Sequence, residues 1–138
     1  AKYLDRIVYD EKGSHHHTEE VALTASNASE AIAISIRQLD QFCHPMVVIR
    51  LEEYEDSDYM NITGGLGLYF IEIEHDERFY DYIDLTKGEE EVEVWTSDQG
   101  FAAEERHVNR NVDQVIAIAQ DYALDGEPSR RVDWLYRR

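Results

Sequence analysis

Short stretches of alternating or continuously apolar residues, separated by polar segments, recur along most of the chain. Alternation with a period of two is typical of half-buried strands, and apolar runs of about four to eight residues are typical of buried ones. The predicted strands are Tyr3–Tyr9, Glu20–Thr24, Met46–Leu51, Asp58–Thr63, Leu66–Glu74, Phe79–Leu85, Glu91–Ser97 and Val132–Tyr136. We expect the first two to form a hairpin around a polar tip, the next two to form a second hairpin, and the following three to form a meander.

The apolar spacing changes to three and four residues in two segments, which predicts two helices. The first covers Ser26–Gln41, where Asn27 and Glu30 resemble a capping box. The second begins after an N-cap at Asn111 and ends before Gly126, because glycine accepts the left-handed conformation that follows many helices. Their predicted buried faces are Ala28, Ile32, Ile36 and Leu39 in the first helix and Val112, Val115, Ile116, Ala119 and Tyr122 in the second.

The strands come in consecutive runs, and the helices do not alternate with them. This order predicts an α+β fold with a mostly antiparallel sheet of about six to eight strands and two helices packed on one face. The 138 residues suit a single domain over 1–138. The segment Asp98–Arg110 is predicted to be a loop.

Strand alternation also predicts what the uncovered face of the sheet displays. In Leu66–Glu74 the core side is Tyr69, Ile71 and Ile73, and in Glu91–Ser97 it is Val92 and Val94. In Phe79–Leu85 the core side is Phe79, Ile83 and Leu85. The side chains predicted on the uncovered face are then Phe70, Glu72, Glu74, Tyr80, Tyr82, Asp84, Glu91, Glu93 and Trp95.

Charge adds to this picture. The chain has 30 acidic and 13 basic residues and a formal net charge of −17, and 15 of the acids lie between residues 52 and 93. Such a charge repels nucleic acids and acidic membranes and attracts basic proteins, although solubility alone also accounts for it. We therefore expect neither nucleic acid nor a membrane as a partner.

Aromatic rings within a field of carboxylates are what a protein-binding surface needs, because rings supply buried area and charges supply steering. The alternative is an ordinary solvated sheet face. Acids of the 52–58 loop are a second candidate contact. The predicted partner-binding residues are Glu72, Glu74, Glu91, Glu93, Tyr82 and Trp95 on the face and Asp56 and Asp58 in the loop.

Motifs for catalysis, cofactors or metals are weak, and we assign no catalytic, cofactor-binding or metal-binding residue. The Gly64-Gly65-Leu66-Gly67 segment lacks the lysine and helix of a phosphate loop, and His15-His16-His17 cannot surround one ion in relaxed geometry. The enzymatic alternative is a hydrolase or metal-dependent enzyme that uses His75, Asp76 and His107. We expect a protein that is not an enzyme.

The chain has one cysteine, Cys43, no apolar leader in its first 20 residues and no apolar run long enough to span a membrane. These features predict a cytoplasmic protein.

Several segments between Asn27 and Trp134 resemble the immunity-protein-one family of bacterial polymorphic toxin systems. They are the first helix with the MVVIRL strand, the YMNITGGLGLYFIEI segment, the late helix, and the ending Gly126-Glu127-Pro128 followed by Val132-Asp133-Trp134. The resemblance implies a cognate inhibitor that binds the toxic C-terminal domain of a secreted protein, often a nuclease or nucleic-acid deaminase. It implies no catalytic residues and leaves the contact residues open, because these vary with the toxin.

The sequence therefore predicts an immunity protein that binds a basic toxin domain through an acidic surface. The alternative is an acidic adaptor or oligomerisation domain without a toxin partner, and a homodimer remains open in either case.

Overall fold

The computed structural model describes residues 3–52, 58–95 and 100–137. Within these ranges the strands are β1 Tyr3–Tyr9, β2 His16–Ala22, β3 Met46–Arg50, β4 Tyr59–Gly65, β5 Leu68–His75, β6 Arg78–Ile83, β7 Glu91–Trp95, β8 Phe101–Glu104, β9 Val108–Asn109 and β10 Asp133–Arg137. The helices are α1 Ala28–Arg37 and α2 Val112–Asp125, with a short 3-10 turn, η1, at Glu105–His107.

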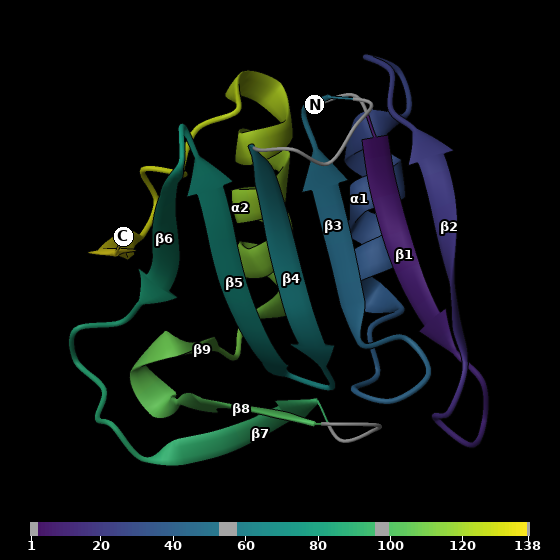
Figure 1. The fold of residues 1–138 in the computed structure, drawn as a ribbon. Coiled ribbons are helices and arrows are strands. Elements are labelled where there is room, and N and C mark those ends of the chain that lie inside the picture. Colours follow the sequence, from purple (N-terminus) through teal and green to yellow (C-terminus); the bar gives the residue numbers. More distant parts are fainter. Residues whose placement is uncertain (1–2, 53–57, 96–99, 138) are drawn as a thin grey trace.

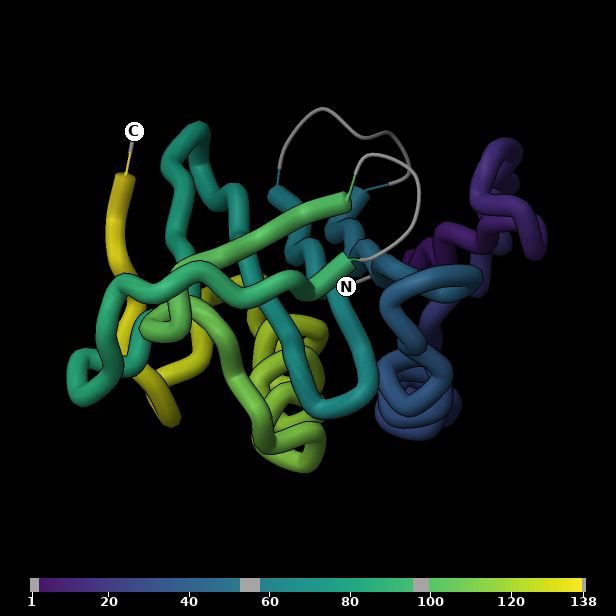
Figure 2. The backbone as a smooth tube through the Cα atoms, turned by 90° about the horizontal axis from the view of Figure 1, so that it is seen from below, coloured from purple at the N-terminus to yellow at the C-terminus, as the bar shows by residue number. Residues whose placement is uncertain are grey.

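The main sheet is antiparallel, with the strand order β10-β6-β5-β4-β3-β1-β2, and β9 pairs with β5. Both α-helices cover one face of this sheet, as Figure 1 shows. A separate two-stranded ribbon of β7 and β8 lies on the opposite face, and the view along the sheet in Figure 2 shows these three layers. The predicted α+β class, with two helices on one face of a mostly antiparallel sheet, is confirmed.

The core fills the space between the sheet and the helices. Alternate strand residues meet the apolar faces of α1 and α2, and fully buried side chains here include Ile32, Ile36, Ile49, Met60, Ile62, Ile71, Ile73, Ile118 and Tyr122. Removing this apolar surface from water is the main stabilising contribution to the fold.

The sequence predicted the ends of α2 correctly but not those of α1. The Asn111 side chain accepts the Gln114 amide, and Gly126 has φ of 73°, so both predicted ends of α2 are confirmed. At α1 the predicted capping box does not form, because the Asn27 carboxamide oxygen accepts the Thr24 amide instead. Helix α1 also ends at Arg37, before the predicted Gln41, where φ is 69°.

The predicted β1–β2 hairpin forms, but β2 begins at His16, so part of the predicted polar tip is strand. The predicted meander is wrong beyond β6. Strand β7 does not continue a meander beside β6: it pairs with β8, which comes from the predicted loop 98–110, and β10 takes the place beside β6. Period-two alternation identifies a strand but carries no information about its partner, which long-range packing selects.

The face assignment of β6 is also wrong. Asp76 and Glu77 both have positive φ, and this two-residue turn pairs His75 with Arg78 and Ile73 with Tyr80. Tyr80 and Tyr82 therefore share the helix-covered face with Ile73. Tyr82 is only 6% exposed and packs in the main core, so its predicted place on the uncovered face is contradicted. Leu85, predicted to face the core, lies beyond the end of β6 and is exposed.

Candidate functional site

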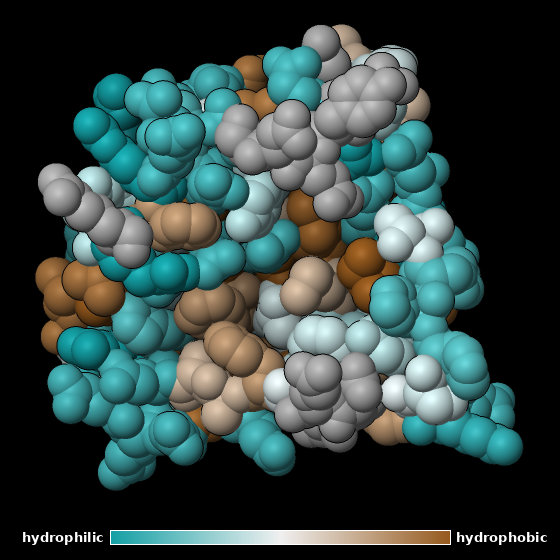
Figure 3. Space-filling model, viewed as in Figure 1, coloured by the Kyte–Doolittle hydropathy of each residue, from teal (hydrophilic) through white to brown (hydrophobic). Residues whose placement is uncertain are grey.

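The face of the main sheet that the helices leave uncovered is called the open face below, and Figure 3 views it directly. The view shows an apolar central area, hollowed in the middle, inside a hydrophilic rim. Strand register places the following side chains on this face: Tyr3, Asp5, Ile7 and Tyr9 of β1, Met46, Val48 and Arg50 of β3, Tyr59, Asn61 and Thr63 of β4, Phe70, Glu72 and Glu74 of β5, Phe79 and Asp81 of β6, and Leu135 and Arg137 of β10.

A hollow of about 640 Å³ lies where the β7–β8 ribbon approaches this face. We call it the aromatic hollow, and its lining is Tyr9, His16, Met46, Asn61, Thr63, Phe70, Glu72, Trp95, Gly100, Phe101 and Arg137. Two ring pairs shape its walls: Phe70 with Phe101, whose centroids are 5.0 Å apart, and Tyr9 with Trp95, at 5.6 Å. The pairs join the sheet to the ribbon and the ribbon to the β1–β2 hairpin.

The ribbon is held over the sheet by a small second core. Val94 of β7 and Ala103 of β8 are buried with Val108 against Leu68 and Phe70 of β5. Val92 and Val94, which were predicted to face the main core, therefore pack in this second core between the ribbon and the sheet.

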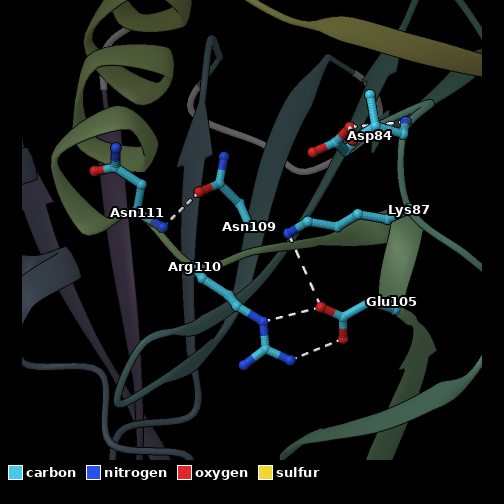
Figure 4. A network of polar contacts seen from close by, with 7 residues as sticks. Asp84, Lys87, Glu105, Asn109, Arg110 and Asn111 are labelled. Carbon is cyan, nitrogen blue, oxygen red and sulfur yellow. Dashed lines mark hydrogen bonds and ion pairs between the residues drawn. The ribbon is translucent and has the colours of Figure 1, made fainter.

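Polar contacts also fix the segment that connects β8 to α2, as Figure 4 shows. Glu105 accepts two hydrogen bonds from Arg110, at 2.9 and 2.8 Å, and its carboxylate lies 3.9 Å from Lys87. The Arg110 contacts hold the pKa of Glu105 below its ordinary value. The Asn109 side chain accepts the Asn111 amide at 2.8 Å, which ties this segment to the start of α2. The ribbon is therefore held by the apolar contacts of Val94 and Ala103 and by the polar contacts of the segment after β8.

Arg137 forms a charged cluster at one side of the aromatic hollow. It donates to the Asp81 carboxylate at 2.9 and 3.2 Å and also to Glu72, and its guanidinium lies 4.9 Å from the Phe79 ring centroid. Burial raises the pKa of Glu72, even though Arg137 and a hydrogen bond from Asn61 favour its charged form. The loss of hydration on burial therefore outweighs the contacts with Arg137 and Asn61 that favour the ionised carboxylate.

Arg50 forms a second cluster on the other half of the open face. It donates to Asp5 at 2.7 and 3.0 Å and to Glu20 at 2.7 Å, and it lies 4.9 Å from the Tyr3 ring centroid. Between the clusters Tyr59 is hydrogen-bonded to Glu74, and burial together with nearby carboxylates raises the pKa of Tyr59 to about 12.

The predicted site residues divide into separate groups. Glu72, Glu74 and Trp95 lie on the open face or at its ribbon wall, whereas Glu91 and Glu93 are exposed on the ribbon and alternate with the buried Val94. Tyr82 belongs to the core. Figure 2 shows that the backbone of the ribbon stands off the main sheet, and Glu91 and Glu93 lie on this separate ribbon.

The two predicted loop acids have different outcomes. Asp58 accepts the Asp76 amide at 2.7 Å, which joins the start of β4 to the β5–β6 turn. Its carboxylate therefore has a structural contact in addition to any role in binding. Asp56 lies outside the described residues.

Sequence reasoning missed several residues of this surface. Arg137 and Arg50 were not candidates, because their carboxylate partners are 56 and 45 residues away in the chain. Phe101 was predicted to lie in a loop. Tyr9 was predicted to lie in a hairpin, but the face of the sheet that it occupies was not predicted. The alternation within β1 and β3 was a usable signal for the faces of Tyr9 and Arg50, but no local signal shows that Phe101 meets Phe70.

The residues of the enzymatic alternative are not brought together. His107 is buried near the start of β5, where its Nδ1 lies 2.7 Å from the Tyr82 carbonyl oxygen, whereas His75 ends β5 and lies 4.0 Å from Asp58. In the described ranges, no group of three or more His, Cys, Asp or Glu side chains is placed to hold a metal ion.

Neither a scan of protein-family models nor a search of curated proteins finds a match to this chain. None of the helices in residues 3–52, 58–95 and 100–137 combines the length and the apolar character needed to cross a membrane.

Proposed function

We propose that this protein is an immunity protein that binds a basic toxin domain in the cytoplasm and neutralises it, with the open face as the contact surface. The observation that carries the proposal is the aromatic hollow together with the carboxylates around it. The protein acts by occupying its partner and performs no chemistry of its own.

The charge balance of the open face supports a basic partner. Among the described residues, the acids Asp5, Glu20, Glu72, Glu74 and Asp81 of this face surround two arginines, Arg50 and Arg137. The clusters therefore retain negative charge after their internal pairs form. A negative surface on a chain of net charge −17 increases the rate of encounter with a basic protein.

The aromatic hollow supplies what charge alone does not. Rings of Phe70, Trp95 and Phe101 are available to contact a partner at the concave centre of the surface, and buried aromatic contacts contribute a large share of binding free energy in protein interfaces. The central position of the hollow within a polar rim matches the usual anatomy of such interfaces. Toxins that act on nucleic acids have basic clefts, which an acidic surface with an apolar centre complements.

The direct test is co-expression with the toxin-like C-terminal domain encoded beside this gene, followed by co-purification and a growth-rescue assay. A stoichiometric complex and restored growth are the expected results. Failure of both would contradict the immunity function for that pairing. A stable dimer of this chain that buries Trp95, with no complex, would instead support the adaptor alternative.

The contact surface is tested by charge reversal. The Glu72→Lys/Glu74→Lys variant should associate with the toxin about tenfold more slowly at low salt. The matched control is Glu30→Lys/Glu127→Lys, which changes the charge equally at exposed positions outside the open face. Equal association rates for the two variants, measured by stopped flow after both are shown to be folded, would exclude the open face.

A further inference from the structure

The aromatic hollow combines aromatic walls with two charged side chains, Glu72 and Arg137, which form an ion pair. Phe70, Trp95 and Phe101 provide ring surface, and Glu72 provides a carboxylate with 20% of its side chain exposed. A ligand in this hollow would meet aromatic surface and a carboxylate whose arginine partner is shared with Asp81.

The carboxylate at the base has capacity for another donor. A carboxylate offers about four lone-pair sites. Glu72 accepts Arg137 and Asn61, and Arg137 is shared with Asp81. A cation that entered the hollow would thus meet the Glu72 carboxylate, whose partner Arg137 also binds Asp81.

The desolvation of Glu72 points in the same direction. Burial raises the pKa of this carboxyl, which means that its negative charge is incompletely compensated in the free protein. A cationic donor would relieve this condition most and a neutral donor less, whereas an anionic ligand would worsen it.

We propose that the aromatic hollow receives an arginine side chain of the partner protein, with its guanidinium stacked between the rings and hydrogen-bonded to Glu72. This inference rests on the proposed function in one respect, that the partner is a basic protein. It adds the chemical identity of the group that is recognised.

Arginine suits the hollow better than lysine for physical reasons. A guanidinium is planar, weakly hydrated and able to stack on aromatic faces while it donates in its own plane to a carboxylate. An ammonium is compact and strongly hydrated, so it loses more solvation in an apolar hollow. Arg137 and Arg50 already show this arrangement within the protein, since each lies 4.9 Å from an aromatic ring centroid and donates to carboxylates.

The test uses three blocked pentapeptides that carry one arginine, lysine or citrulline between glycines, titrated into the full-length ¹⁵N-labelled protein at constant ionic strength. The chain has two tryptophans, so the two indole N–H resonances report two places. Trp95 lines the hollow, and Trp134 donates to the Ser129 carbonyl oxygen on the helix-covered side. A Trp95→Phe variant assigns the signals.

The arginine peptide should shift the Trp95 signal in a saturable way and leave the Trp134 signal in place. The lysine peptide, with the same charge, should bind at least about threefold more weakly, and neutral citrulline should not saturate. Equal dissociation constants for arginine and lysine, saturable binding of citrulline, or an unmoved Trp95 signal would overturn the inference.

Variants locate the site. Glu72→Gln should weaken binding of the arginine peptide about tenfold, whereas Glu93→Gln, the same change on the ribbon, should weaken it less than about twofold. Phe101→Leu removes one ring, keeps Trp95 as the reporter and should weaken binding about threefold. If Glu72→Gln and Phe101→Leu both bind like the wild type, the hollow is not the site.

The inference and the proposed function fail separately. A toxin complex that forms normally with both Glu72→Gln and Phe101→Leu would remove the hollow from recognition and leave the immunity function intact. Arginine-selective peptide binding without any toxin complex would keep the hollow as an arginine site and remove the toxin assignment.

Discussion

Arg50 and Arg137 lie on the same open face and are bound in the same manner, yet their surroundings differ. Each donates to two carboxylates, and each lies 4.9 Å from an aromatic ring centroid. The Arg50 side chain is 5% exposed and its partner Asp5 is 4% exposed, whereas the Arg137 side chain is 42% exposed. The two clusters share their chemistry and differ in access to water.

This difference separates a structural cluster from one that is able to respond to a ligand. A buried ion pair depends on both partners, because a charge left alone in the interior has lost its hydration. A half-exposed pair competes with water at all times and exchanges partners at little cost. The Arg137 cluster borders the aromatic hollow, so the more adaptable of the two clusters lies where we propose that the partner binds.

The largest expected effect is loss of the buried arginine. Arg50→Ala should lower the free energy of unfolding by about 3–5 kcal/mol, because Asp5 would remain buried without a counter-charge. Urea unfolding measures this effect. Arg110→Ala is the control, because its pair with Glu105 is half-exposed and should contribute less than about 1 kcal/mol. An Arg50→Ala variant as stable as this control would remove the distinction between the clusters.

Loss of the half-exposed arginine should have a smaller effect. Arg137→Ala should lower the free energy of unfolding by about 1–2 kcal/mol, since water reaches much of the cluster while Asp81 remains partly buried. The same urea titration measures it. A loss as large as that of Arg50→Ala would show that exposure of the guanidinium does not distinguish the two sites.

Replacing Glu72 with Gln should change the free energy of unfolding slightly, in a pH-dependent way and in the opposite direction to the arginine substitutions. Its pKa is raised in the folded protein, so the folded state holds its proton more readily, and the ionised carboxylate lowers stability once the pH exceeds the folded-state pKa. At about pH 7, Glu72→Gln should therefore equal or exceed the wild type in unfolding free energy, by at most about 1 kcal/mol.

That advantage should disappear as the pH falls toward about 4, because the wild-type carboxyl then becomes protonated. Urea titrations of both proteins across this range measure the difference. A Glu72→Gln variant clearly less stable than the wild type at neutral pH would mean that attraction to Arg137 outweighs the burial of Glu72.

The smallest expected effect is on salt sensitivity. Raising the salt concentration from about 0.1 to about 1 M shortens the Debye length from about 10 to about 3 Å and screens exposed charges most. The destabilisation caused by Arg137→Ala should fall by about half, and that caused by Arg50→Ala by less than about a quarter. Equal salt dependence would place both clusters in similar dielectric surroundings.

Local patterns predicted most of the elements in this fold. The N-cap at Asn111 and the glycine at position 126 determine the ends of α2 because their effects act within one helical turn. The faces of β5 followed from alternation, since Tyr69, Ile71 and Ile73 are all buried while Phe70, Glu72 and Glu74 are not. Of the candidate surface, the sequence predicted the β5 residues Phe70, Glu72 and Glu74 and the ribbon residue Trp95.

The face of β6 shows how local reasoning failed. Side-chain hydrophobicity favoured Phe79 as inward and Tyr82 as outward, but the Asp76-Glu77 turn determines the pairing and reverses both. A shift of one residue in an antiparallel pair moves every side chain to the other face. The turn length was therefore more informative than the hydrophobic pattern.

The sequence by itself determined the α+β class, the two helices, most strand positions and the excess of negative charge, because these depend on composition and on contacts between near neighbours. Only the tertiary structure decided that Arg137 joins Glu72 and Asp81, that β7 and β8 form a ribbon over the sheet, and that Phe101 meets Phe70. These contacts join segments that are far apart in the chain. Their formation depends on the packing of the whole sheet, and no short stretch of sequence carries that information.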